Sequence, residues 1–437
     1  MFDFLISEDG KARREATHWL EMAERVYDNR RDLLPAAQLA ELQAARGDLK
    51  AAVKAKAGAA PLKAGMERLE KCLRSCGGKI YPVNSMVENV EFFLVAAIVI
   101  LGLRAYFVQP FKIPTNSMWP SYYGMTYEAF EPGHEPNVLV RGLRLLTLGA
   151  IRQTVVAPAD GEVMLAVSSN GAPLVSQRAG RSFLIFPSMR QEFTFMVGGQ
   201  VVTLDLPAEF DAELNWMRDT VFGQPSGGIG AAIGNAIHKT NGRLESSMLS
   251  VQDGNQRGDV RAYWLPVGRK VKRGDTIASF DILTGDLLFV ERVSYNFVAP
   301  KVGSGFVFRT ENIHSEEMQD RAGNQIKQYF VKRLVGTPGD ELEVRPPMLY
   351  RNGQPIEGSP AFGWNAERKG LYPGYTNVGM LPAGEKLTVP EHSYFAMGDN
   401  SPRSKDSRMW GFVPEKDVVG RPLFIYYPLT KRWGLAH

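Results

Sequence analysis

The chain has 437 residues, a length that predicts roughly two to four structural units rather than one. At 44% hydrophobic and 22% charged residues, its composition is typical of a globular protein and excludes a largely disordered one. Lys and Arg number 51 against 47 Asp and Glu, so the formal net charge of +4 gives no support for nucleic acid as a partner.

The counts of cysteine and histidine exclude several kinds of chemistry. Only Cys72 and Cys76 occur, which excludes a disulfide-stapled scaffold and a cysteine-based zinc site. We expect both to be free thiols on one helix. The six histidines are scattered without ligand spacing, so a histidine-built metal enzyme is disfavoured. Any chemistry is therefore expected to use Ser, Lys, Asp and Glu.

The first segment, residues 1–86, is predicted to be a helical region that serves packing or assembly. Its start carries acidic residues and no apolar stretch, which excludes a cleavable signal peptide. Apolar residues recur at helical spacing from about Lys11 and again beyond Pro35. A third helix is expected over residues 61–75, ended by the glycine pair 77–78.

One strongly apolar stretch follows. Residues 92–103 contain no charge, but a run of twelve is shorter than the roughly 20 residues that a bilayer requires, and a buried helix is the alternative. Counted over residues 87–108 the length suffices, with Glu88, Glu91 and Arg104 near the ends, where their charges can reach the interface. We therefore expect one transmembrane anchor over 87–108.

Flanking charges predict the orientation of this anchor. Residues 113–140 contain no Lys or Arg, whereas several basic residues precede the anchor. The positive-inside rule then places the N-terminal helices in the cytoplasm and the C-terminal part on the outer face of the cytoplasmic membrane. The preceding basic residues are Lys63, Arg68, Lys71, Arg74 and Lys79.

The chain beyond residue 150 is predicted to be mainly β. Short apolar or alternating runs are separated by Gly, Pro, Asn and Asp turns. One helix is expected over 208–222, and the Gly-rich residues 223–234 are expected to form a loop that lacks the Lys of a phosphate-binding loop. The expected strands include Thr154–Val156, Glu162–Val167, Ser182–Phe186, Val201–Leu206, Leu287–Val293 and Phe306–Arg309.

Three segments carry residues suited to chemistry, although each has an ordinary structural explanation. Residues 108–121 hold Ser117 between two prolines, which alone indicates a turn. Residues 329–340 hold Lys332 on an apolar strand, where a lysine is normally paired or reaches solvent. Residues 394–411 are rich in Asp, Asn and Ser and are alone typical of a turn with an internal salt bridge.

In this order, after an apolar anchor, the three segments together resemble the bacterial type I signal peptidases (leader peptidases). These are membrane-bound serine proteases with a Ser/Lys dyad. Residues 114–121 match the family's Pro-Ser-x-Ser-Met-x-Pro-Thr box conservatively, and residues 332–340 contain its complete Lys-Arg-x-x-Gly-x-Pro-Gly-Asp box. Residues 398–411 contain Gly-Asp-Asn and Ser-x-Asp-Ser-Arg-x-x-Gly, and 285–290 and 349–353 are shorter similarities.

The resemblance implies that Ser117 is the nucleophile that forms an acyl-enzyme, with Lys332 as the general base. An unperturbed lysine, with a pKa of about 10.4, is neutral in only about one molecule in 2,500 at pH 7. Burial among the apolar neighbours of Lys332 is expected to lower its pKa. Arg333, next in the strand, is expected to point to the opposite face.

The resemblance also implies supporting roles. The Thr115 hydroxyl and the Ser117 N–H would form the oxyanion hole. Ser404 would orient Lys332. The remaining residues, for which a purely structural role is the alternative, are Asp406 and Arg408 as a bracing pair and Asp399 and Asn400 in the turn.

The chain departs from the family pattern at two places. Asn116 stands where a glycine usually precedes the nucleophile, and residues 301–308 lack the usual Asp of the second strand. In addition, Ser117 and Lys332 lie 215 positions apart, which is far more than a compact core needs.

The spacing predicts a peptidase core that is split by an insertion. The core would comprise 109–121 plus 285–437, and residues 122–284 would form an inserted, mostly β domain. Within it, residues 157–163 and 267–275 resemble the two ends of a lipoyl- or biotinyl-type β sandwich. No carrier lysine with its hairpin is evident, so a structural domain is expected.

The expected architecture is thus mainly β: a signal-peptidase-like catalytic core with an inserted β domain, preceded by a helical region and one transmembrane helix. The implied function is endoproteolytic removal of signal peptides from exported preproteins. These would bind extended, with small residues at the specificity positions. Membrane lipid is the other expected partner, no metal or organic cofactor is implied, and no oligomeric state is predicted.

Two other functions remain open at this point. A membrane-anchored adaptor with an inactive peptidase core is disfavoured by the intact Ser117, Lys332, Ser404 and Asp406. A self-cleaving Ser/Lys regulator is disfavoured by the anchor and by the box in 398–411.

Overall fold

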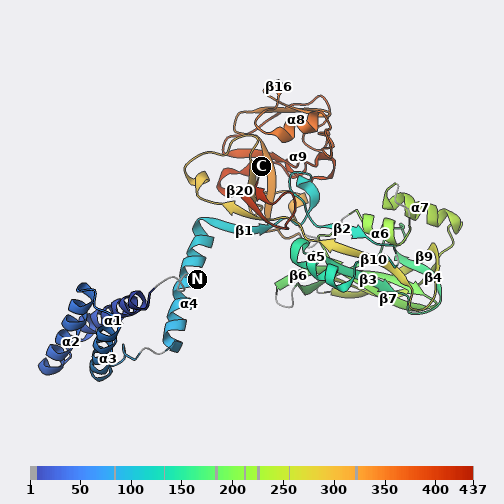
Figure 1. The fold of residues 1–437 in the computed structure, drawn as a ribbon. Helices are drawn as coiled ribbons and strands as arrows, with labels where there is room; N and C mark the ends of the chain where they lie inside the picture. The colour runs from blue at the N-terminus through green and yellow to red at the C-terminus, as the bar shows by residue number, and fades with distance from the viewer. Residues whose placement is uncertain are drawn as a thin grey trace. The chain divides into compact units, whose positions relative to one another are not determined.

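The computed structural model describes residues 7–82, 85–131, 133–182, 186–210, 213–223, 227–254, 256–319 and 323–436. The chain divides into two compact units, Met1–Gly102 and Leu103–His437 (Figure 1).

The first unit contains three packed helices. The Ser7 hydroxyl accepts a hydrogen bond from the Gly10 N–H and caps the first of them, where acidic residues complement the helix dipole. A core of small and branched side chains, including Ala16, Leu42 and Leu69, is completely buried between the helices, and Cys72 and Cys76 are buried free thiols. The helices are α1 Glu8–Arg30, α2 Ala36–Lys54 and α3 Ala59–Cys76.

The apolar segment forms a single helix, α4, over Ser85–Tyr106. Within it, Met86–Tyr106 is long and apolar enough to cross a membrane by length and composition, with a mean hydropathy of 2.1 and no part of that window buried. The helix ends two residues before the expected boundary at 108, because the chain then turns extended and enters a sheet.

An eight-stranded antiparallel sheet joins the two ends of the second unit. Strand β1, Val108–Lys112, follows α4 directly and pairs with β11, Leu287–Glu291, so that Val108 lies opposite Glu291. The long chain between them therefore leaves and re-enters the same sheet. The strand order is β1, β11, β20 (Val418–Tyr427), β12 (Gly305–Arg309), β13 (Tyr329–Gly336), β18 (Ser393–Met397) and β19 (Val413–Pro414), with β21 (Gly434–Leu435) also on β20.

The centre of this sheet is buried on both faces. Strand β13 pairs with β12 and with β18; Phe306 and Phe308 on one face and Val307 and Val335 on the other are completely buried. A strand buried on both sides is the environment that a lysine finds least favourable when charged. A smaller sheet and two short helices complete this part: β16 (Gln354–Pro355), β15 (Met348–Arg351), β14 (Glu341–Arg345), β17 (Leu387–Thr388), α8 (Pro360–Ala366) and α9 (Ser407–Trp410).

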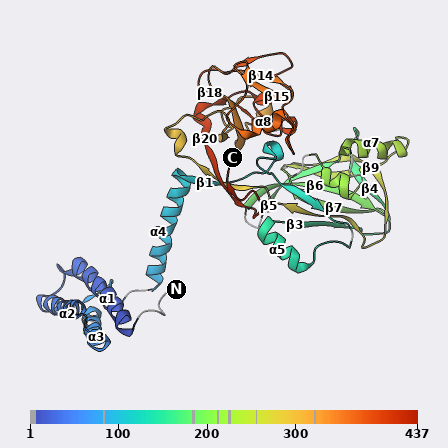
Figure 2. The same cartoon turned by 45° about the horizontal axis from the view of Figure 1, so that its top comes forward.

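Residues 122–284 form two further sheets around a separate aromatic core. Phe193, Trp216 and Phe280 are completely buried there. Figure 2 shows the ribbon of this region. A pairing between β4 and β6 closes five strands of the larger sheet into a ring. The larger sheet has the order β4 (Gly161–Val167), β9 (Gln256–Val271), β8 (Glu245–Gly254), β5 (Val175–Ser182), β6 (Phe186–Val197) and β7 (Gln200–Pro207), and the smaller one β2 (Thr126–Ala129), β10 (Thr276–Leu283) and β3 (Ile151–Val156).

The two segments that resemble the ends of a carrier-type sandwich are neighbours in space. Gly161 pairs with Val271, and the N–H of Gly274 donates to the carbonyl of Ala157 at 2.9 Å. The two segments therefore meet at the pairing of β4 with β9.

The helices of this part differ from expectation. The helix expected over 208–222 is limited to α6, Asn215–Thr220, because Leu214 adopts a left-handed backbone conformation just before it. The loop expected over 223–234 contains the start of α7, Ile229–Lys239. Its buried Ala232, Ile233 and Ala236 provide packing that outweighs the low helix propensity of glycine.

Helix α5, Val138–Leu148, was not expected from the sequence. A strand was expected over Ser182–Phe186, but its residues 183–185 lie outside the described residues. The other expected strands are present with shifted ends, for example β7 over Gln200–Pro207.

Candidate active site

Ser117 lies in a one-turn 3-10 helix, Asn116–Met118, that follows β1. The Met118 side chain is buried and anchors the turn. The N–H of Asn400 donates to the Ser117 carbonyl at 3.1 Å, and the Asn400 side-chain amide donates to the Asn116 carbonyl at 3.0 Å. The turn is thus held against the segment that follows β18.

The amine of Lys332 meets the hydroxyl of Ser117. Lys332 Nζ donates to Ser117 Oγ at 2.5 Å, across 215 positions of sequence. Lys332 is 4% exposed in the middle of β13, and its amine lies 5.6 Å from the centroid of the Phe330 ring. No carboxylate forms an ion pair with it among the described residues.

This environment lowers the pKa of Lys332 to about 8. Burial is the largest cause, the Asp406 carboxylate acts in the opposite direction, and the Arg408 guanidinium lowers the pKa further. At a pKa of about 8, about a tenth of the molecules carry a neutral amine at pH 7. The amine is therefore able to accept the proton of the hydroxyl that it touches.

Thr115 also contacts Ser117. Its Oγ1 donates to Ser117 Oγ at 3.5 Å, which is a long and weak contact, and the residue is exposed. The hydroxyl is thus free to turn toward a bound group.

Arg333 and Asp399 form a completely buried ion pair behind the dyad. Arg333 Nε donates to Asp399 Oδ1 at 2.8 Å and Nη2 donates to Oδ2 at 2.6 Å. Ser121 Oγ also donates to Asp399 Oδ2, at 2.5 Å, which ties the end of the nucleophile segment to the same carboxylate. The third guanidinium nitrogen, Arg333 Nη1, donates to the Gly303 carbonyl at 2.7 Å.

Asp406 and Arg408 form a second buried pair. Arg408 Nη2 donates to Asp406 Oδ2 at 2.7 Å, and the same oxygen accepts the N–H of Gly398 at 3.0 Å. Arg408 Nη1 donates to Ser401 Oγ at 2.7 Å. This pair fixes the backbone of residues 398–408 beside the dyad.

Ser404 is near this cluster, but its hydroxyl oxygen is buried and has no hydrogen-bond partner among the described residues. The structure does not show the expected hydrogen bond to Lys332. Gly398 fills the narrow space between Ser404 and the backbone of Ser117. A Cβ at Gly398 would lie 2.2 Å from Ser404 Oγ and 2.3 Å from the Ser117 carbonyl oxygen. A side chain at this position would displace one of the two.

Asn116, where the resembled family usually has glycine, uses its side chain to close the nucleophile loop. Its amide donates to the Met125 carbonyl at 3.2 Å, and its Oδ1 accepts the N–H of Gly124 at 2.9 Å. Sequence reasoning did not find this function, nor the part played by Ser121 and Ser401. The partner of Ser121, Asp399, lies 278 positions away. Asn116 and Ser401 bond to residues 7 to 9 positions away, through loop conformations that no residue pattern indicated.

The structure thus brings Ser117, Lys332 and Thr115 together, with Asp399, Asp406 and Arg408 in the two pairs behind them. Among the described residues, no group of three or more His, Cys, Asp or Glu side chains is placed to hold a metal ion.

A family model described as signal peptidase, peptidase S26, matches residues 269–427. The match includes Lys332, Asp399 and Asp406 and begins after Ser117. The family model therefore does not include Ser117, and it is the contact between Lys332 and Ser117 in the structure that links Ser117 to the matched part.

Named relatives agree with this match. The chain is 39% identical to a "Probable signal peptidase I-1" of Synechocystis sp. over 150 residues, which are 34% of this chain and 66% of that one. It is 29% identical to a "Signal peptidase I" of Leptolyngbya laminosa, over 33% of this chain and 62% of that one. A "Signal peptidase IB" of Staphylococcus aureus is 34% identical, over 32% of this chain and 71% of that one.

A crystal structure of a signal peptidase I from Enterococcus faecalis V583 shares 30% identity, covering 28% of this chain and 98% of that one, with a TM-score of 0.21. The class of protein that the family model and the named relatives define is a serine peptidase, a hydrolase. Within that class, the chain belongs to the signal peptidase I family, peptidase S26.

Proposed function

We propose that the protein is a membrane-bound endopeptidase that removes N-terminal signal peptides from exported preproteins, with Ser117 as nucleophile and Lys332 as general base. The observation that carries the proposal is the 2.5 Å contact of Lys332 Nζ with Ser117 Oγ in a buried, apolar setting. The family relatives are named signal peptidases, which supports this substrate class.

The first chemical step forms an acyl-enzyme. Neutral Lys332 accepts the Ser117 hydroxyl proton as Oγ attacks the scissile carbonyl carbon, and the carbonyl oxygen becomes an oxyanion. The C–N bond then breaks, and the Lys332 ammonium gives its proton to the leaving amine of the mature protein. The signal peptide remains bound to Ser117 as an ester.

The second step is hydrolysis of that ester. Lys332, neutral again, accepts a proton from a water molecule, whose oxygen attacks the ester carbonyl. The signal peptide leaves with a new carboxylate, and Ser117 regains its proton. Both oxyanions would be stabilised by the Ser117 N–H and by the Thr115 hydroxyl, whose contact with Ser117 Oγ at 3.5 Å is long and weak.

The preprotein would bind as an extended strand beside the dyad, with small residues near the scissile bond. In this proposal residues 1–86 are cytoplasmic, residues 87–108 anchor the chain, and 109–121 plus 285–437 form the catalytic core on the outer face. Residues 122–284 form an inserted structural domain. The apolar character of α4 and the basic residues before it support this topology.

Cleavage of a preprotein with an Ala-x-Ala site by the detergent-solubilised protein tests the activity. Ser117→Ala and Lys332→Ala are expected to reduce cleavage to background, whereas Lys386→Ala, which removes an exposed lysine paired with Glu341, serves as the matched control. Cleavage by Ser117→Ala at the wild-type rate would exclude the proposed nucleophile.

Topology is tested separately with spheroplasts. Protease added outside is expected to digest the chain beyond residue 120 and to spare the N-terminal helices. Digestion of those helices instead would reverse the orientation.

A further inference from the structure

Helix α5 exposes its apolar side to solvent. Val138, Leu139, Leu143 and Leu146 recur at helical spacing on one side, and Leu139 and Leu146 are 85% and 74% exposed. None of the helix's eleven residues is buried, and none is acidic. A surface helix of a globular protein normally buries its apolar stripe against the core.

Specific polar contacts fix α5 in this orientation. Arg144 faces inward, donating from Nε to Asp281 Oδ2 at 3.0 Å and from Nη2 to Glu128 Oε2 at 2.7 Å. Asn137 caps the start of the helix, and Gly149 ends it in a left-handed conformation. The outward apolar side is therefore part of an ordered structure.

The adjoining C-terminal turn has the same character. The N–H of Leu429 donates to the Thr147 carbonyl at 2.8 Å, which places the turn against the end of α5. Leu429, Lys431 and Trp433 are exposed in this turn. Exposed Trp and Lys beside aliphatic side chains are typical of protein surfaces at a membrane interface.

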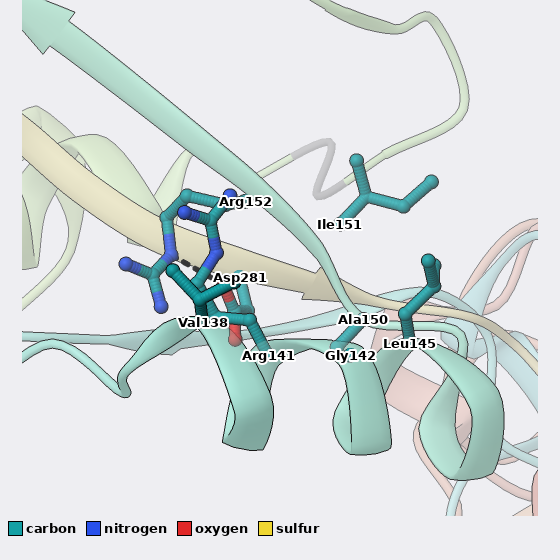
Figure 3. A pocket seen from close by; sticks show the side chains of 8 residues that line it. All are labelled: Val138, Arg141, Gly142, Leu145, Ala150, Ile151, Arg152 and Asp281. Atoms are coloured by element: carbon teal, nitrogen blue, oxygen red, sulfur yellow. Dashed lines mark hydrogen bonds and ion pairs between the residues drawn. The ribbon is translucent and has the colours of Figure 1, made fainter.

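A pocket of about 390 Å³ lies between α5 and the strands β3 and β10. Figure 3 shows the Arg141 and Arg152 side chains at one end of this pocket and Leu145 and Ile151 at the other. The pocket therefore has a cationic end and an apolar end. Asp281 also lines it, with its carboxylate engaged by Arg144 and Arg152.

The two arginines retain donors for an anion. The Arg152 side chain is only 9% exposed, and its Nε donates to Asp281 Oδ1 at 2.5 Å. Its Nη2 has no hydrogen-bond partner among the described residues, and one face of the guanidinium lies over the Phe130 ring, 4.5 Å from the ring centroid. Arg141 is exposed and forms no ion pair within the part of the chain that the structure describes.

We infer that this surface binds an anionic phospholipid. Arg141 and Arg152 hold the phosphate of the headgroup at the cationic end of the pocket, and the outward side of α5, with Leu429 and Trp433, enters the boundary between headgroups and acyl chains. An amphiphile matches both features, whereas a free phosphate would leave the apolar side of α5 uncovered. The inference relies on the proposed membrane anchor, which keeps the chain next to lipid.

A fluorescent probe on α5 tests the contact. The full chain with Leu146→Cys carries an environment-sensitive nitrobenzoxadiazole label and is reconstituted into vesicles of phosphatidylcholine, with or without phosphatidylglycerol. Asn235→Cys, an exposed position on α7, is the matched label site. The native Cys72 and Cys76 are buried, and the wild-type chain treated in the same way measures their background labelling.

We expect the label at position 146 to emit at shorter wavelength with phosphatidylglycerol and to be quenched by spin-labelled lipid, and the label at 235 to show neither effect. Arg141→Glu and Arg152→Gln should abolish the difference between the two vesicle compositions. Arg261→Glu, at an exposed strand position, should preserve it. Arg141→Glu is decisive because this exposed side chain makes no ion pair with any described residue, so its replacement should not destabilise the fold.

Three results would overturn the inference: a label at 146 that remains in water in both vesicles, a full phosphatidylglycerol response in Arg141→Glu, or the same response to inorganic phosphate in phosphatidylcholine vesicles. Preprotein cleavage in detergent, measured in parallel, separates this inference from the proposed peptidase. The α5 variants should cleave at the wild-type rate there, and Ser117→Ala should retain the lipid response.

Discussion

Lys332 and Arg333 are consecutive residues of β13 and both are almost completely buried, yet their cationic groups lie on opposite faces of the strand. Lys332 Nζ contacts Ser117 Oγ, and the Arg333 guanidinium contacts the Asp399 carboxylate. The alternation of side chains along a strand produces this separation. One cation is thereby held in its charged form by a carboxylate, while the other is made easier to deprotonate by burial.

The pKa of Lys332 predicts the pH dependence of cleavage. Because the proposed base, Lys332, would act in its neutral form and its pKa is about 8, kcat/KM should rise about tenfold per pH unit below that value and level off above it. Lys332→Arg, whose guanidinium remains protonated, should be inactive throughout. A pH–rate profile of peptide cleavage checks this, and a rate that does not change with pH below 8 would contradict it.

The same shift affects stability. The pKa of Lys332 is lower in the folded chain than its ordinary value of 10.5, so the unfolded chain binds more protons between about pH 8 and 10.5. The free energy of unfolding should therefore rise with pH across this window. Below about pH 8, Lys332→Met should be more stable than the wild type by up to about 3 kcal/mol.

Thermal unfolding in detergent, with Ser117→Ala as the background for both proteins, measures this difference. Equal stability of the two at neutral pH would show that the buried amine carries no such cost.

The Arg333–Asp399 pair should be needed for folding. Arg333→Met leaves Asp399 as an unpaired charge in a completely buried position, which typically costs about 3–5 kcal/mol. The double variant Arg333→Met with Asp399→Leu should recover much of this loss. Arg345→Met removes a half-exposed partner of Glu343 and should change stability by about 1 kcal/mol or less. Additive effects of the two buried substitutions would contradict the pairing.

The side chain of Asn116 should contribute to the rate. Asn116→Ala removes two hydrogen bonds that close the loop from Ser117 to Met125, each worth about 1 kcal/mol. We expect kcat to fall about tenfold, with little change in the stability of the protein outside this loop. Asn170→Ala, which removes side-chain hydrogen bonds within a single exposed turn, is the control. An unchanged kcat would mean that the loop holds Ser117 without Asn116.

Thr115→Val tests the oxyanion site. Removal of the hydroxyl should lower kcat by about 100- to 1,000-fold with little change in KM, because the donor acts on charge that develops only in the transition state. Thr115→Ser, which retains the hydroxyl, should keep most of the activity. A loss in KM alone would assign Thr115 to substrate binding.

Much of the strand structure could be predicted because local pattern determines it. Residues 162–167 and 306–309 form strands close to where apolar runs indicated them. Helix α7 was missed because its glycines suggested a loop, whereas the burial of Ile233 and Ala236 depends on a core assembled from distant strands. Packing of this kind is not visible in a local window.

The candidate site likewise has features that could be predicted from the sequence and features that could not. The resemblance selected Ser117 and Lys332, and alternation along β13 placed Arg333 on the opposite face. The contact of Ser121 with Asp399, and the Ser404 hydroxyl, which has no partner among the described residues, follow from how three separated segments meet. The hydrogen bonds of Asn116 span only 8 and 9 positions, but they depend on a loop conformation that no residue pattern indicated.

The short connection between α4 and Ser117 would limit where the proposed enzyme can cut a substrate. Ser117 follows Tyr106, the last residue of α4, by 117 − 106 = 11 positions, which span at most about 40 Å when fully extended. In the proposed topology, with α4 in a bilayer, this connection would hold Ser117 within that distance of the membrane surface, and only bonds in the same layer would come within its reach. Because residues 122–284 follow Ser117 in the chain, the sheets that they form do not lengthen this connection.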